Sequence, residues 1–87
     1  MKTRHLIFDD LAWEDYLYWQ AHDKQNQKKI NQLIKDIKRS PFVGLGKPEP
    51  LKYELAGAWS RRINDEHRLV YEISDDAIRI IACRYHY

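Results

Sequence analysis

The chain has 87 residues and a formal net charge of +2, and 44% of its residues are hydrophobic and 13% aromatic. These values exclude a disordered chain and predict one small domain over residues 1–87. A single cysteine excludes an internal disulfide, and no apolar run approaches the roughly 20 residues of a membrane span. The first residues also lack the apolar core of a signal peptide, so we expect a cytoplasmic protein that binds no membrane.

Two helices are predicted in the first half of the chain. A short apolar stretch over residues 5–8 is a candidate strand, and either Asp9 or Asp10 can cap a helix over about 11–21. Four residues share one side of that helix and form its predicted stripe, namely Trp13, Tyr16, Leu17 and Gln20. Asp23 is a second cap, opening a helix to about Arg39. Its apolar residues have the spacing of a core-facing stripe: Ile30, Leu33, Ile34 and Ile37.

The second half of the chain has the signature of a sheet. All three prolines and two of the three glycines fall within residues 41–50, which predicts a loop of defined shape. The periodicity then shifts toward two and predicts strands over 51–55, 59–64, 67–73 and 77–87. Together these elements predict an α+β fold, with an N-terminal strand and a helical hairpin packed on a twisted antiparallel sheet.

Positive charge is concentrated in the middle of the chain. Residues 1–23 sum to −3, residues 24–52 to +6 and residues 53–87 to −1. One side of the second predicted helix carries Lys24, Lys28, Asn31, Lys35 and Lys38. This stripe fits a solvated helix face and a contact with a polyanion equally well, and such a contact would be directed at phosphates.

Glu49 lies between two prolines in the segment Lys47-Pro48-Glu49-Pro50-Leu51-Lys52. Proline restricts both its own backbone and that of the residue before it, so the position of Glu49 is fixed from both sides. A rigid turn with an exposed carboxylate explains this pattern. A general base near a phosphate, between Lys47 and Lys52, explains it as well.

Arg62 and Arg68 are candidates for the open face of the sheet. Side chains alternate along a strand, so Leu69 and Tyr71 are predicted on the helix-packed face and Arg68 on the opposite face. Glu66 lies two residues from Arg68 and is able to orient its guanidinium. Arg62 alternates with Arg61 and is assigned to the same open face. Cross-strand ion pairs on a solvated sheet are the structural alternative.

The last residues are Cys83-Arg84-Tyr85-His86-Tyr87. The buried positions are expected to be Ile78, Ile80 and Ala82, and His86 continues the same alternation. Histidine exchanges protons near neutral pH, so His86 is a candidate acid, although structural and functional roles fit it equally.

The sequence contains no motif for nucleotide or metal chemistry. There is no glycine-rich phosphate loop and no Cys/His set with zinc spacing, so we expect no cofactor and no metal. Cys83 has apolar neighbours, which predicts a packed thiol. A fixed carboxylate, arginines and a histidine instead suit metal-free RNA cleavage. In that reaction the substrate's 2′-hydroxyl attacks the adjacent phosphate, which gives a 2′,3′-cyclic phosphate and a 5′-hydroxyl.

The sequence also resembles the YoeB toxins of the RelE-like superfamily over most of its length. Five segments carry the resemblance: 13–19 (WEDYLYW), 46–52 (GKPEPLK), 59–63 (WSRRI), 66–71 (EHRLVY) and 82–87 (ACRYHY). It implies an mRNA endoribonuclease that acts in the ribosomal A site, close to ribosomal RNA, and inhibits translation.

The resemblance also implies roles for single residues and for partners. Glu49 would be the base, Arg68 would stabilise the phosphate, His86 would be the acid and Tyr87 would shape the site. Residues expected near RNA are Lys47, Lys52, Arg62, Lys28 and Lys35, the last two from the basic helix. The implied partners are a second copy in a homodimer and a YefM-like antitoxin with an acidic, disordered C-terminal segment.

Two alternatives remain open at this stage. One is a non-catalytic nucleic-acid or ribosome-binding module that uses the basic helix, and the other is an RNase that needs no ribosome. The antitoxin is expected either to block RNA entry or to displace the C-terminal residues.

Overall fold

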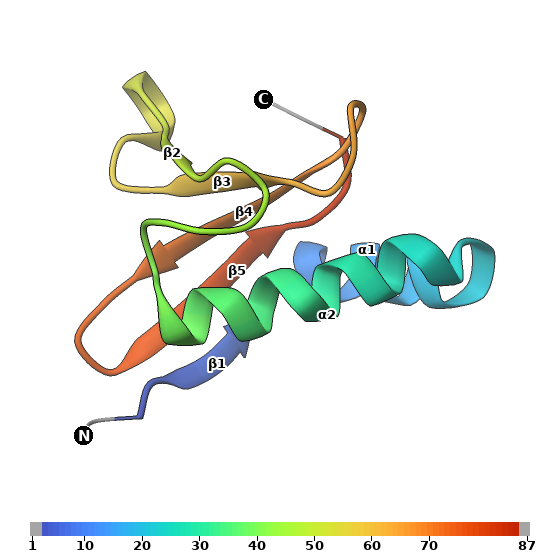
Figure 1. The fold of residues 1–87 in the computed structure, drawn as a ribbon, viewed down its shortest axis with the longest axis horizontal. Coiled ribbons are helices and arrows are strands. Elements are labelled where there is room, and N and C mark those ends of the chain that lie inside the picture. Colours follow the sequence, from blue (N-terminus) through green and yellow to red (C-terminus); the bar gives the residue numbers. More distant parts are fainter. Residues whose placement is uncertain (1–2, 86–87) are drawn as a thin grey trace.

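A five-stranded sheet with both helices on one face makes up the computed structural model, which describes residues 3–85 (Figure 1). The strand order is β1-β5-β4-β3-β2. The elements are β1 (His5–Phe8), α1 (Asp10–His22), α2 (Lys24–Arg39), β2 (Glu49–Pro50), β3 (Trp59–Arg62), β4 (Arg68–Ile73) and β5 (Ala77–Ala82). The expected α+β class is therefore confirmed.

The sheet is mixed, whereas the sequence predicted antiparallel pairing. β2, β3, β4 and β5 pair antiparallel in turn, but β1 pairs parallel with β5. Parallel neighbours need a long crossover, and the two helices and three other strands between β1 and β5 provide it. The predicted N-terminal strand thus becomes an edge of the sheet.

The core forms between α2 and the two central strands. The predicted stripe of α2 is buried, and it belongs to one apolar cluster with Leu69 and Tyr71 of β4 and Ile78 and Ile80 of β5. Asp23 caps α2 as predicted, because its Oδ1 accepts from the amides of Gln25 and Asn26. At α1 the residue in the N-cap position is Asp9, whose carboxylate instead accepts two hydrogen bonds of 2.8 Å from Arg79.

The buried side of α1 is not the predicted one. Trp13, Leu17 and Gln20 are exposed, and the buried residues of this helix are Ala12, Asp15 and Trp19. The amide of Cys83 donates to Asp15 Oδ2 at 3.0 Å, and Trp19 Nε1 donates to the Cys83 carbonyl at 2.8 Å. These two hydrogen bonds attach Asp15 and Trp19 to the chain after β5, so the buried side of α1 differs from the one that its apolar periodicity predicted.

The predicted strand over 51–55 is wrong. β2 has only two residues, and a 3₁₀ turn over Tyr53–Leu55 follows it. Pro50 has no N–H to continue a ladder, and Tyr53 adopts a φ of 57°, which no strand accommodates. The chain from Glu49 to Ala58 forms an arm at the edge of the sheet (Figure 1).

The last strand ends at Ala82, five residues before its predicted end. Tyr71 lies opposite Ile80, but Val70 lies opposite Ala82, so Ile81 is an extra residue in a β-bulge. Ala82 is buried, but it lies opposite Val70 and so on the other face from Ile78 and Ile80, contrary to the predicted alternation, and Cys83 rather than Arg84 enters the core. His86 and Tyr87 lie outside the described residues.

Candidate functional site

Glu49, Arg62 and Arg68 share the face of the sheet that the helices leave uncovered. Glu49 lies directly opposite Ser60, and Arg62 lies directly opposite Arg68. Opposite residues of an antiparallel pair point to the same side, and Ser60 and Arg62 alternate with Arg61, which faces α2. The sheet therefore brings together the carboxylate and the two arginines expected from the sequence.

The strands set the spacing of these three residues. Glu49 and Arg68 belong to strands two positions apart, and neighbouring strands are separated by about 4.8 Å, so their backbones are roughly 10 Å apart across β3. Arg62 lies on β3, directly opposite Arg68. One acidic and two basic residues therefore lie on three neighbouring strands of the same face.

The turn between β3 and β4 orients Arg68. Its Nη1 donates to the carbonyls of Asn64 at 2.7 Å, His67 at 3.1 Å and Asp65 at 3.3 Å. Glu66 was expected to orient this arginine, but its carboxylate lies 3.8 Å from Nε2 of His67 instead. Among residues 3–85, backbone carbonyls rather than a carboxylate bind the guanidinium of Arg68, which favours binding of an anion.

Arg61 anchors the loop that leads to Glu49. Its side chain is fully buried and donates to the carbonyls of Ser40, Val43 and Leu45 at 2.6, 2.9 and 3.0 Å. The backbone amide of Arg62 binds the Gly46 carbonyl at 2.6 Å. These contacts tie residues 40–46 to β3, the strand that pairs with Glu49.

Asp36 completes this anchor from α2. Its carboxylate pairs with Arg61 at 2.6 Å and with Arg39 at 2.7 Å, and it accepts from the amide of Leu45 at 2.9 Å. The Leu45 amide, followed by the two arginines, lowers the pKa of Asp36 to about 2. Gly44 has a φ of 119°, and a Cβ there would overlap the Asp36 carboxylate, so only glycine fits.

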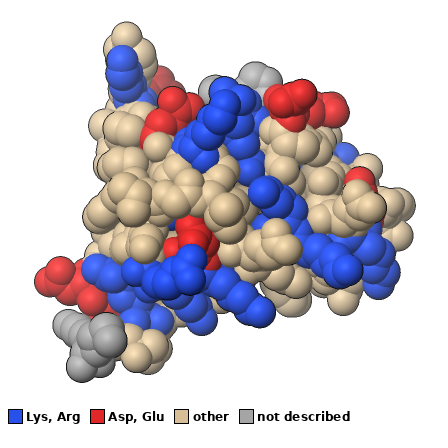
Figure 2. Space-filling model, in the orientation of Figure 1, with Lys and Arg blue, Asp and Glu red and all other residues tan. Residues whose placement is uncertain are grey.

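The lysines fall into two groups. Lys47 and Lys52 are exposed on either side of β2, so they flank Glu49 as expected. Lys28 and Lys35 are exposed on α2, which covers the opposite face of the sheet, and they are not part of the Glu49 site. Figure 2 shows lysine and arginine side chains spread along this helix face.

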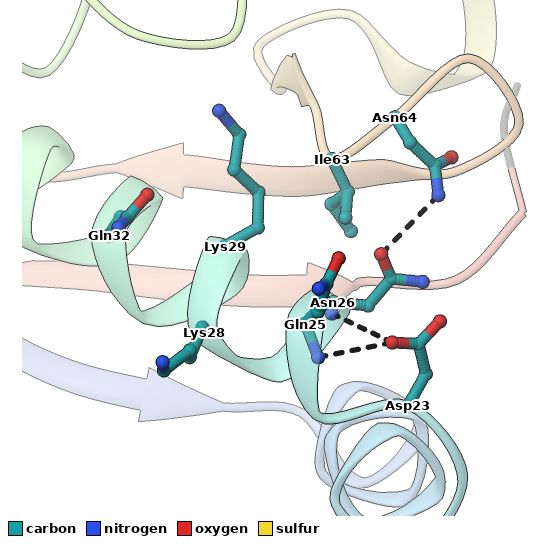
Figure 3. Close-up of a pocket in the computed structure, with 8 residues that line it drawn as sticks. All are labelled: Asp23, Gln25, Asn26, Lys28, Lys29, Gln32, Ile63 and Asn64. Carbon is teal, nitrogen blue, oxygen red and sulfur yellow. Dashed lines mark hydrogen bonds between the residues drawn. The ribbon is translucent and has the colours of Figure 1, made fainter.

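Lys28 and Lys29 line a groove of about 650 Å³ between α2 and the β3–β4 turn (Figure 3). Asn64, on the turn, donates from Nδ2 to Asn26 Oδ1 at 3.4 Å across this groove. The carbonyl of Asn64 also accepts from Arg68, so the basic side of α2 and the arginine site meet at one turn.

The chain after β5 is held against α1 and β4. Cys83 is fully buried, and its burial, followed by the charge of Asp15, raises the pKa of the thiol to about 12. The prediction of a packed thiol is confirmed. The expected acid His86 and the expected Tyr87 come directly after this segment, but they lie outside the described residues.

Within residues 3–85, no three histidine, cysteine or carboxylate side chains form a cluster that could hold a metal ion. In the same range, no helix is long and apolar enough to span a bilayer.

Comparison with known proteins identifies the chain. The family model described as the YoeB-like toxin of bacterial type II toxin–antitoxin systems matches residues 8–87. The chain belongs to this family. Toxin YoeB of Escherichia coli K12 is 63% identical over 82 residues, which cover 94% of this chain and 98% of that protein.

Solved structures of YoeB toxins superpose closely on this fold. The YoeB dimer from Staphylococcus aureus has a TM-score of 0.92 at 51% identity and covers 98% of this chain and 99% of its own. A YoeB–YefM complex from the same organism has a TM-score of 0.89 at 50% identity, with 97% and 98% covered. The RelE-like fold expected from the sequence is therefore confirmed, and the protein is a YoeB-like toxin.

Sequence reasoning missed the residues that support the site from behind, namely Asp15, Asp36, Arg61 and His67. All four are buried and polar. A signal was present, because Arg61 alternates with Trp59 and Ile63, and Asp36 adjoins the apolar stripe of α2. A charged residue at a position predicted to be buried indicates a specific partner, although the sequence does not say which one.

Proposed function

We propose that this YoeB-like toxin is a metal-independent endoribonuclease that cleaves mRNA in the ribosomal A site and so inhibits translation. The observation that carries the proposal is the common face of Glu49, Arg62 and Arg68 at one end of the sheet. A carboxylate that can act as a base and two cations on one face suit attack by a 2′-hydroxyl on the adjacent phosphate.

Each side chain has one task in the proposed reaction. Glu49 removes the proton from the 2′-hydroxyl, and the oxygen attacks the neighbouring phosphorus. Arg68 stabilises the added negative charge of the phosphorane, and Arg62, Lys47 and Lys52 hold the flanking RNA. His86 donates a proton to the departing 5′-oxygen, which leaves a 2′,3′-cyclic phosphate and a 5′-hydroxyl. Tyr87 shapes the site.

The proposal extends to partners and setting. The relatives include a YoeB dimer and a YoeB–YefM complex, and we propose a homodimer and a YefM-like antitoxin for this toxin in the cytoplasm. An acidic, disordered C-terminal segment of the antitoxin would fold onto the basic surface, and either block RNA entry or displace the C-terminal residues. The exposed Lys28 and Lys35 would contact ribosomal RNA.

One observation favours a different function. The basic face of α2 is separate from the Glu49 face, so it could serve a non-catalytic ribosome-binding module. In that case translation would stop without any cut in the mRNA, and only the lysines would matter.

Glu49→Gln and His86→Ala, each measured on mRNA in programmed ribosomes, separate the two functions. The proposed mechanism predicts that each lowers the cleavage rate at saturating ribosomes by about 100-fold or more, because general acid–base groups contribute about 10²–10⁴. A double Lys28→Gln and Lys35→Gln variant is the control, with weaker ribosome binding at an unchanged saturated rate. Arrest that persists in Glu49→Gln and is lost only in the lysine variant would indicate the binding module.

A further inference from the structure

The chain between β5 and His86 is attached residue by residue. Cys83 binds α1 through both its amide and its carbonyl. The guanidinium of Arg84 lies 3.5 Å from the ring centroid of Tyr18, also on α1. Tyr85 is bound at its amide by His67, just before β4, and at its carbonyl by Arg68, the first residue of β4. Contacts at three successive residues beyond the last strand indicate that the position of this segment is specified.

His67 supplies one half of the attachment at Tyr85. The amide of Tyr85 donates to His67 Nδ1 at 2.8 Å, and the Tyr85 carbonyl accepts from the amide of Arg68 at 2.7 Å. Because a backbone N–H can only donate, Nδ1 must be the unprotonated nitrogen of the ring. The neutral imidazole with its proton on Nε2 is therefore the form that binds.

The position of His67 is fixed through both its side chain and its backbone. It is only 8% exposed, and its ring meets Trp19 edge to face at 4.7 Å between centroids. Its backbone amide donates to Asn64 Oδ1 at 2.8 Å, within the turn that orients Arg68. Tyr85 has a φ of 65°, which is strained for a residue other than glycine, so its surroundings must impose this conformation.

We propose that His67 is a positioning residue, whose Nδ1 seats the Tyr85 amide beside Arg68 and thereby fixes the backbone that leads directly into His86. The inference rests on the proposed function, in which His86 is the acid. Because His67 and Arg68 are adjacent, the phosphate-binding arginine lies next to the residue that holds Tyr85, which directly precedes the proposed acid. Displacement of an acid by about 1 Å can cost about 100-fold in rate.

Two substitutions separate the acceptor from the shape of the side chain. His67→Phe keeps an aromatic ring against Trp19 but has no acceptor, and His67→Asn places Oδ1 close to the position of Nδ1. We expect His67→Phe to lower the saturated cleavage rate on programmed ribosomes by about 10- to 100-fold with little change in KM. His67→Asn should restore most of that rate.

Hydrogen exchange at the Tyr85 amide provides a readout that does not depend on activity. Exchange should be fast in His67→Phe and slow in the native toxin and in His67→Asn, while the thermal melts confirm that both variants fold. The proposal would be overturned by a His67→Phe toxin that cleaves slowly although its Tyr85 amide stays protected. It would also be overturned by a His67→Phe toxin that cleaves at the native rate with an unprotected Tyr85 amide. His86→Ala cleaving at the native rate would overturn the proposed function instead, since that change leaves the Tyr85 amide bound.

Discussion

At the scale of single residues, Arg61 and Arg62 are neighbours in sequence with opposite environments. Arg61 is fully buried, and its guanidinium forms an ion pair with Asp36 and donates to the carbonyls of the loop. Arg62, in contrast, is exposed and lies opposite Arg68. One arginine therefore supports the fold and the other is available to RNA, although the two differ by a single position.

Substitution of each arginine by methionine should separate stability from activity. Arg61→Met leaves three partly buried carbonyls without this donor, at about 1 kcal/mol or more each, so we expect a loss of about 3 kcal/mol in the free energy of unfolding. Arg62→Met, the matched control, should change that free energy by less than about 0.5 kcal/mol yet slow mRNA cleavage. Urea unfolding and ribosome assays measure the two effects.

If Arg61→Met unfolds at the same urea concentration as the native toxin, the loop does not depend on this anchor. Alternation along β3 predicted which arginine would be exposed. It did not predict the partner of the other one, because Asp36 is 25 residues away on a different element.

At the scale of elements, the loop over residues 40–46 depends on the charge of Asp36. The pKa of this carboxyl is about 2 in the folded protein, below its ordinary value of 3.8. Between these two values the unfolded chain binds a proton that the folded chain does not, so stability is lost as the pH falls through this range. Above about pH 4 the contribution is complete.

The prediction is tested by urea unfolding of the native toxin and of Asp36→Asn over about pH 2–6. Asparagine keeps an acceptor for the Leu45 amide but cannot titrate. The difference in unfolding free energy between the two proteins should be constant above about pH 4 and should shrink toward pH 2. A difference that stays constant down to pH 2 would show that Asp36 does not carry this pH dependence.

The elements themselves were predicted unevenly, for physical reasons. α2 and β4 follow directly from their apolar periods and, for α2, from the cap at Asp23. The bulge at Ile81 and the two-residue β2 do not, because both depend on pairing with a neighbouring strand. The bulge matters most, since it reverses the alternation that the sequence alone would extend to His86.

At the scale of the whole molecule, the two proposed functional surfaces lie on different faces. Glu49, Arg62 and Arg68 occupy the uncovered face of the sheet, and the lysines of α2 lie on the side of the helices (Figure 2). The charge of +6 over residues 24–52 falls on the basic helix and on the loop that holds Glu49, and the fold places these two elements on different faces. The two faces meet at the β3–β4 turn, where Asn64 contacts Asn26 and Arg68.

This division suits a small nuclease that relies on its surroundings. A chain of 87 residues has one core and little room for a deep pocket. In the proposed mechanism RNA supplies the nucleophile, and the ribosome, bound through the lysine face, aligns the strand. The site itself then needs only a carboxylate, the arginines and an acid.

The most direct test uses an mRNA with a single 2′-deoxynucleotide at the position that is cut, in the A site of programmed ribosomes. If the 2′-hydroxyl is the nucleophile, the toxin will leave this mRNA intact at that position and will cut the all-ribose control into a 2′,3′-cyclic phosphate and a 5′-hydroxyl end. Cleavage of the deoxy-substituted mRNA at the same position, or a 5′-phosphate on the product of the control, would contradict the mechanism.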